Sequence, residues 1–177
     1  MRRTTRLLPA AALAAFALVG CTTPDPTPTP PPTSDATPVF ASDEEALAAA
    51  EEAYGEYLAT VDAIFADGGA DPERLLKFVT RDQYEVDLQG FDQLRDAGLR
   101  GTGTAAFVLS FQSFDASTGD VTAYSCDDLS ETDVIDASGK SVVGAEREVL
   151  VPYEVSFSGM PLRIASRTIW EGTGVCA

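Results

Sequence analysis

Carboxyl and phenol groups are the acid–base groups available in this sequence, because its 177 residues include no histidine. Histidine is the only side chain whose unperturbed pKa lies near neutral pH, and it is the commonest metal ligand. Its absence excludes Ser-His-Asp and Cys-His catalysis and histidine-ligated zinc sites. A carboxyl group takes part in acid–base chemistry near neutral pH where a desolvated pocket raises its pKa.

One carboxyl group and several aromatic side chains occur where they could line such a pocket. Asp87 lies next to the apolar stripe of a predicted helix, and tyrosines recur at helical or strand spacing. The candidates for lining a pocket are Tyr54, Tyr57, Tyr84, Asp87, Tyr153 and Trp170. The same spacing is also typical of aromatic residues in an ordinary core. We therefore name no catalytic residue.

Two further sets of charged residues could bind ions. Arg163 and Arg167 could receive an anionic ligand or pair with carboxylates of the chain. An acidic run could bind Ca²⁺ or form solvated surface, and it consists of Asp127, Asp128, Glu131, Asp133 and Asp136. The spacing of this run does not match the helix-loop-helix calcium motif, so we favour solvated surface. We predict no metal ion and no cofactor.

The charge balance argues against nucleic acid as a partner. The sequence has 12 basic and 28 acidic residues, a net charge of −16, and residues 42–177 alone carry −17. Binding to phosphate groups requires clustered Lys and Arg. The acidity therefore belongs to the part of the chain that is expected to fold.

Three predicted helices carry the candidate pocket residues of the first half of the domain, Tyr57, Tyr84 and Asp87. A capping box at Ser42 starts a long amphipathic pattern that ends before Gly68. Pro72 suits the first position of a short second helix. A second capping box at Thr80 predicts a third helix that ends near Gly98.

The apolar period changes from about 3.6 to 2 after residue 101, which predicts strands. They cover 104–111, 121–126, 148–158 and 162–171, with a hairpin joining 134–135 to 142–143. Helices followed by strands with short connections indicate an α+β domain. We predict a single domain over residues 42–177, in which N-terminal helices pack on an antiparallel sheet.

The first 21 residues resemble the signal peptide of a bacterial lipoprotein. Three arginines precede an uncharged stretch, 7–19, that is too short to cross a bilayer core of about 30 Å as a helix. Leu18-Val19-Gly20-Cys21 then resembles the lipobox. The resemblance implies that residues 1–20 are removed and that Cys21 is lipidated, which would anchor the chain on the extracytoplasmic face of the cell membrane. An ordinary secretory signal with a chance cysteine is the alternative.

Residues 21–41 read as a lipidated cysteine followed by a spacer. Residues 22–41 contain seven Pro and six Thr, so neither helix nor sheet can persist there. Such a segment favours an extended polyproline II conformation and acts as a tether. Docking of this segment to a proline-binding groove is the alternative.

The remaining cysteines, Cys126 and Cys176, are expected to form a disulfide. Two leftover cysteines in an exported protein most often pair. The alternative is a reactive dithiol. The two cysteines lack the Cys-x-x-Cys spacing that is typical of such a dithiol, so we favour a structural disulfide.

The order of elements over residues 42–176, a long first helix and a long final hairpin, resembles the nuclear transport factor two superfamily. The resemblance implies a cystatin-like cone, in which the helices pack on a curved sheet. Lipoproteins of Gram-positive bacteria that join a lipobox, a Thr- and Pro-rich spacer and one small domain are also similar. No catalytic residue carries over, because no family motif is present.

Three functions fit these features. We favour a membrane-tethered, non-catalytic domain that binds a small ligand or a protein of the cell envelope. The first alternative is a cone-fold enzyme with lyase or isomerase chemistry, using Asp and Tyr in an apolar cavity. The second is a structural interaction module. A cavity that contains a buried carboxylate would favour a small ligand or an enzyme.

Overall fold

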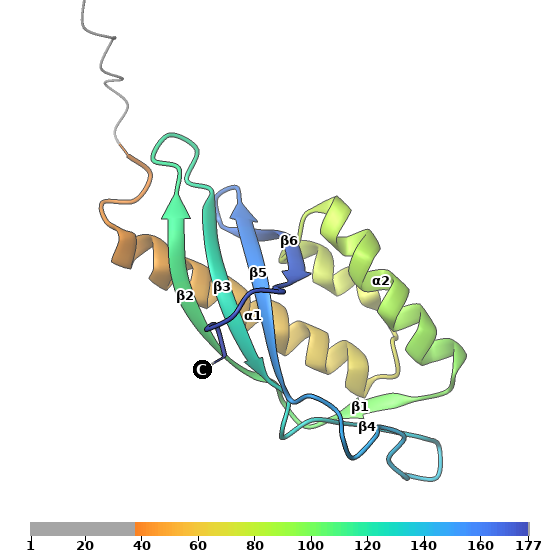
Figure 1. Cartoon of the computed structure of the whole chain (residues 1–177). Helices are drawn as coiled ribbons and strands as arrows, with labels where there is room; N and C mark the ends of the chain where they lie inside the picture. Colours follow the sequence, from red (N-terminus) through yellow and green to blue (C-terminus); the bar gives the residue numbers. More distant parts are fainter. Residues whose placement is uncertain (1–37, 177) are drawn as a thin grey trace, which may run out of the picture. The chain divides into compact units, whose positions relative to one another are not determined.

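The computed structural model describes residues 38–176, which form a layer of helices packed on an antiparallel sheet (Figure 1). The expected signal peptide, the lipidation site Cys21 and the spacer up to residue 37 lie outside the described residues. The fold is α+β, and the helices precede the strands along the chain. They are not at the N-terminus of the chain, because the first of them begins only at Asp43.

Helix α1 spans Asp43–Ala66 and helix α2 spans Arg81–Asp96. Both begin at the expected capping boxes, because the hydroxyls of Ser42 and Thr80 accept hydrogen bonds from backbone N–H groups three residues later. The short helix between them is a 3₁₀ helix, η1, at Pro72–Lys77. Within the described part of the chain, no helix is both long and apolar enough to cross a membrane.

Four strands form the main sheet in the order β2-β3-β5-β6, and every neighbouring pair is antiparallel. Their bounds are Ala106–Phe114 for β2, Val121–Asp128 for β3, Leu150–Ser158 for β5 and Arg163–Ile169 for β6. Helix α1 lies along one face of this sheet, and α2 lies beyond its β6 edge (Figure 1).

Alternation along β3 shows which face of the sheet is the inner one. Val121, Ala123, Ser125 and Asp127 are buried, whereas the residues between them are partly exposed. Opposite them on β5, Val155 and Phe157 are buried as well. The inner face meets the apolar side of α1, where the fully buried residues are Ala46, Ala50, Tyr54 and Ile64.

A second, two-stranded sheet includes one arm of the predicted hairpin at 134–143. Strand β4, Asp133–Ile135, pairs with β1, Arg100–Thr102, and only a single bridge joins Ile135 to Ser141. The loop over 136–140 does turn the chain back, since Asp136 accepts three hydrogen bonds from it. The predicted hairpin is therefore present in part, since the Val142 N–H also donates to the Val134 carbonyl at 2.9 Å. The longer pairing of β4 is with β1, and a partner so far along the chain leaves no local period in the sequence.

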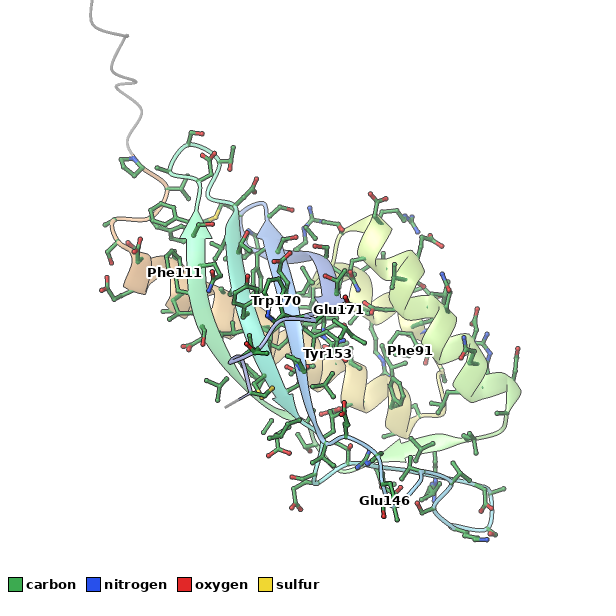
Figure 2. The ribbon with its side chains drawn as sticks, viewed as in Figure 1. Phe91, Phe111, Glu146, Tyr153, Trp170 and Glu171 are labelled. Atoms are coloured by element: carbon green, nitrogen blue, oxygen red, sulfur yellow. A yellow bond between two sulfur atoms is a disulfide. The ribbon has the colours of Figure 1, made fainter. Side chains whose placement is uncertain are left out.

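The C-terminal segment crosses the outer face of the sheet (Figure 2). Cys126 and Cys176 form a disulfide, and Trp170 stacks on Tyr124 with ring centroids 4.5 Å apart. Tyr124 and Cys126 alternate with the buried residues of β3, so both point away from α1. The disulfide holds the end of the chain on this outer surface.

Candidate functional site

A pocket of about 370 Å³ opens where α1 and α2 meet the small sheet. Helix α1 contributes Tyr57, Leu58, Val61, Asp62 and Phe65 to its wall, and α2 contributes Val86, Asp87, Gly90 and Phe91. Each set recurs at four-residue spacing, which places it on one side of its helix. The rest of the wall comes from β1, the end of β3, β4 and two arginines, Arg147 and Arg167. Apolar side chains predominate in the helical walls, which is typical of small-molecule sites.

Asp87 brings a carboxylate with one free oxygen to this wall. Its Oδ1 accepts hydrogen bonds from the Tyr57 hydroxyl at 3.2 Å and from Gln83 Nε2 at 3.0 Å. Its Oδ2 is shielded from solvent, and none of the described residues donates a hydrogen bond to it. Desolvation raises the pKa of Asp87, and the hydrogen bonds from Gln83 and Tyr57 and the charge of Arg167 oppose that rise only in part.

The position of Asp87 depends on the buried side chain of Gln83. The Oε1 atom of Gln83 accepts the backbone N–H of Arg167 at 3.0 Å, so the amide must turn its Nε2 toward Asp87. Gln83 is only 4% exposed, and it connects α2 to β6. Because Gln83 and Tyr57 both donate to Oδ1, Oδ2 is the carboxylate oxygen that has no donor.

A buried ion pair forms part of the pocket wall. Arg167 donates to Asp127 Oδ2 at 2.6 Å and to the Tyr54 hydroxyl oxygen at 2.9 Å. The same hydroxyl donates to Asp127, with distances of 2.9 and 3.0 Å to its two oxygens, and Ser125 donates to Oδ1. Asp127 is fully buried and the Arg167 side chain is 18% exposed. The carboxylate has several donors, so this arrangement satisfies both charges.

The guanidinium of Arg167 also stacks on Tyr153, 3.4 Å from the ring centroid. The pKa of Tyr54 is raised, chiefly by desolvation and in spite of the Arg167 charge, so its phenol stays protonated. Of the two outcomes considered for Arg167, pairing with a carboxylate is the one found. Arg163 is exposed at the start of β6 and lies outside this cluster.

The acidic run that begins at Asp127 is divided by the fold. Solvated surface was the wrong prediction for Asp127, because β3 continues to residue 128 and turns this side chain inward. Asp128 accepts the N–H of Ser130, and Asp133 accepts the Ser141 hydroxyl. Within residues 38–176, no three carboxylate, cysteine or histidine side chains converge on a metal-sized site.

Two further features shape the pocket. Asp62 accepts the backbone N–H of Ala105 at 3.0 Å, and desolvation raises the pKa of Asp62.

Gly90 lies in the middle of α2, and a Cβ placed there would meet no atom within 4 Å. Packing within the domain therefore does not require glycine at this position, although glycine in a helix costs about 1 kcal/mol relative to alanine.

The structure separates the candidate pocket residues. Tyr57 and Asp87 line the pocket, and Tyr153 supports Arg167 from the inner face of β5. Tyr84 is buried in the core, with Arg81 over its ring, and is not part of the pocket wall. Trp170 lies on the outer face of the sheet, because it packs on an outward-facing residue of β3.

The sequence patterns missed Gln83 and Asp127 as members of the site, whereas Tyr54 was a cavity candidate and lies in the cluster around Arg167. In the sequence, Gln83 completes the capping box that begins at Thr80, which gives it a local role already. Asp127 continues the even spacing from Val121 through Ser125, which was the available signal for an inward side chain. Its pairing with Arg167, 40 residues away, had no local signal.

In comparisons with protein-family models, with curated proteins and with solved structures, nothing matches this chain.

Proposed function

We propose that this chain is a lipid-anchored extracytoplasmic protein whose domain binds a small, largely apolar ligand between α1 and α2. The observation that carries the proposal is the free oxygen of Asp87, which is shielded from solvent in the wall of a 370 Å³ pocket. A buried acceptor without a donor costs about 1–3 kcal/mol. A ligand that donates one hydrogen bond to Oδ2 would recover this free energy.

Gly90 supports the same function. Gly90 is an exposed residue of the pocket wall, and no protein atom would touch a Cβ there. Glycine at this position makes α2 less stable than alanine would, and it leaves space in the pocket wall near Asp87. Room next to an unsatisfied acceptor is the arrangement that a ligand-binding site needs.

Mass spectrometry of the full chain under native conditions tests this proposal by detecting a co-purifying small molecule. Gly90→Leu should abolish co-purification, because the new side chain would occupy the pocket. Gln89→Leu is the matched control, since it adds the same side chain to an exposed position of α2 outside the pocket wall. Equal ligand content in the two variants would contradict the assignment of this pocket.

The anchor and the finer fold are proposals as well. The lipobox-like Leu18-Val19-Gly20-Cys21 and the Pro-rich spacer support a lipidated Cys21 and a domain tethered to the cell membrane. The order of elements supports a cystatin-like cone with a curved sheet, as in the nuclear transport factor two superfamily. Cys21→Ser should give a soluble or unprocessed protein, and recovery of a cleaved Cys21→Ser protein with the membranes would overturn the anchor.

An enzyme with lyase or isomerase chemistry is the second candidate function. The raised pKa of Asp87 favours it, because a carboxyl group with such a pKa can exchange a proton with a bound substrate. Asp87→Asn distinguishes the two functions when the co-purified molecule is returned to the protein. An enzyme would convert the molecule and lose this conversion in the variant, whereas a binding protein would release it unchanged in both forms. A structural interaction module, the third candidate, gives no role to the pocket.

A further inference from the structure

We propose, on the basis of the binding function above, that the ligand is an organic cation whose ammonium group donates to Asp87 while its apolar body lies among the pocket's aromatic rings. The pocket wall holds four carboxylates and two guanidinium groups. One pair of opposite charges, Asp127 with Arg167, is directly bonded. The remaining charged groups of the wall are three carboxylates, Asp62, Asp87 and Asp133, and one guanidinium, that of Arg147.

Both guanidinium groups already donate to acceptors of the chain. Arg167 donates to Asp127 and Tyr54 and is stacked on Tyr153. Arg147 donates to the backbone carbonyls of Leu129 and Thr132, and also to the Thr132 hydroxyl at 3.4 Å. An anionic ligand would share these guanidinium groups with their present acceptors and would lie in a pocket whose wall also holds Asp87 and Asp62.

The pocket offers acceptors where a ligand would need to contribute donors. The Tyr57 hydroxyl is already directed at Asp87 Oδ1, and Gln83 donates to the same atom. Oδ2 of Asp87 is free, and Asp62 has accepted a single backbone N–H, which leaves its other oxygen available. An ammonium group supplies several donors and a full charge, and a hydrogen bond between charged groups is about twice as strong as one between neutral groups.

Aromatic faces and the overall charge favour a cation too. Tyr57, Phe65 and Phe91 all belong to the wall, and the Phe65 and Phe91 rings pack edge to face with centroids 5.6 Å apart. Aromatic rings attract cations through their negative faces. The charge of −17 over residues 42–177 would raise the concentration of cations near the domain.

Three probes with the same phenylbutyl body test the charge of the ligand: phenylbutylamine, phenylbutanol and phenylbutyrate. Their binding is measured by calorimetry on the full chain in lipid nanodiscs, with the titration of empty nanodiscs subtracted. We expect the ammonium to bind at least about tenfold more tightly than the alcohol, and phenylbutyrate not to bind. Asp87→Asn should bring the amine and the alcohol to within about threefold of each other, and Asp62→Asn should reduce the difference by less.

The outcomes separate this proposal from the binding function on which it rests. The alcohol or phenylbutyrate could bind the unmodified chain as tightly as the amine, and Gly90→Leu could prevent that binding. This result would overturn the proposal that the ligand is a cation, while the pocket would remain a ligand site. If none of the three binds, both proposals are overturned. The order of affinity among the three probes is measured on the unmodified chain, so that comparison does not depend on any variant folding. An amine preference that Asp87→Asn leaves unchanged would overturn the role of Asp87.

Discussion

The buried pair of Asp127 and Arg167 makes a quantitative prediction about stability. Asp127→Asn leaves the guanidinium without its counter-ion, and Arg167→Met leaves a fully buried carboxylate with donors only from Tyr54 and Ser125. Removing one partner of such a pair costs about 3–5 kcal/mol. The double variant leaves neither charge behind, so its cost should fall below the sum of the two single costs by about 2 kcal/mol or more.

These values would be a large part of the stability of a domain of this size, which is about 5–15 kcal/mol in total. Each kcal/mol corresponds to about 4 °C in Tm, so each single variant should melt about 12–20 °C lower. Arg81→Met is the matched control. It breaks a pair with Glu85 in which both side chains are more than half exposed, and such pairs contribute less than about 1 kcal/mol.

Urea unfolding of the full chain, followed by the fluorescence of Trp170, measures all four variants. Trp170 is the only tryptophan of the sequence and packs on the sheet, so its emission should change on unfolding. Free energies of the two single variants that add to within about 0.5 kcal/mol of the double variant would refute the coupling. A loss at Arg167→Met no larger than at Arg81→Met would show that the buried carboxylate does not depend on the guanidinium.

Two further predictions concern pH and the disulfide. Burial raises the pKa of Asp87, so the folded state holds this proton more tightly than the unfolded chain, and stability falls as pH rises through the folded-state pKa. Asp87→Asn should therefore raise the urea midpoint at neutral pH, and a gain that persisted below the ordinary aspartate pKa would contradict this cause. Replacing Cys126 and Cys176 together by serine opens a loop of 50 residues and should cost about 4 kcal/mol. An unchanged urea midpoint in that variant would show that the crosslink does not stabilise the fold.

Local patterns predicted most of the elements. The capping boxes at Ser42 and Thr80 begin the two α-helices, and strand alternation indicated the four strands of the main sheet. These signals work because a cap or an alternating stripe is complete within a few residues. Strand β1 was not predicted, since it is three residues long, contains Gly101 and gains its partner only 33 residues later.

By itself, the sequence determined the acidic, histidine-free chemistry, the helix starts, the strand period and the resemblance of residues 1–21 to a lipoprotein signal. Only the tertiary structure decided which side chains share the pocket. It turned Asp127 inward to meet Arg167, left one oxygen of Asp87 free, and placed Trp170 on the other side of the sheet. The physical reason is that a pocket is made by residues from elements far apart along the chain. Burial and pairing there depend on how those elements pack, which no local period records.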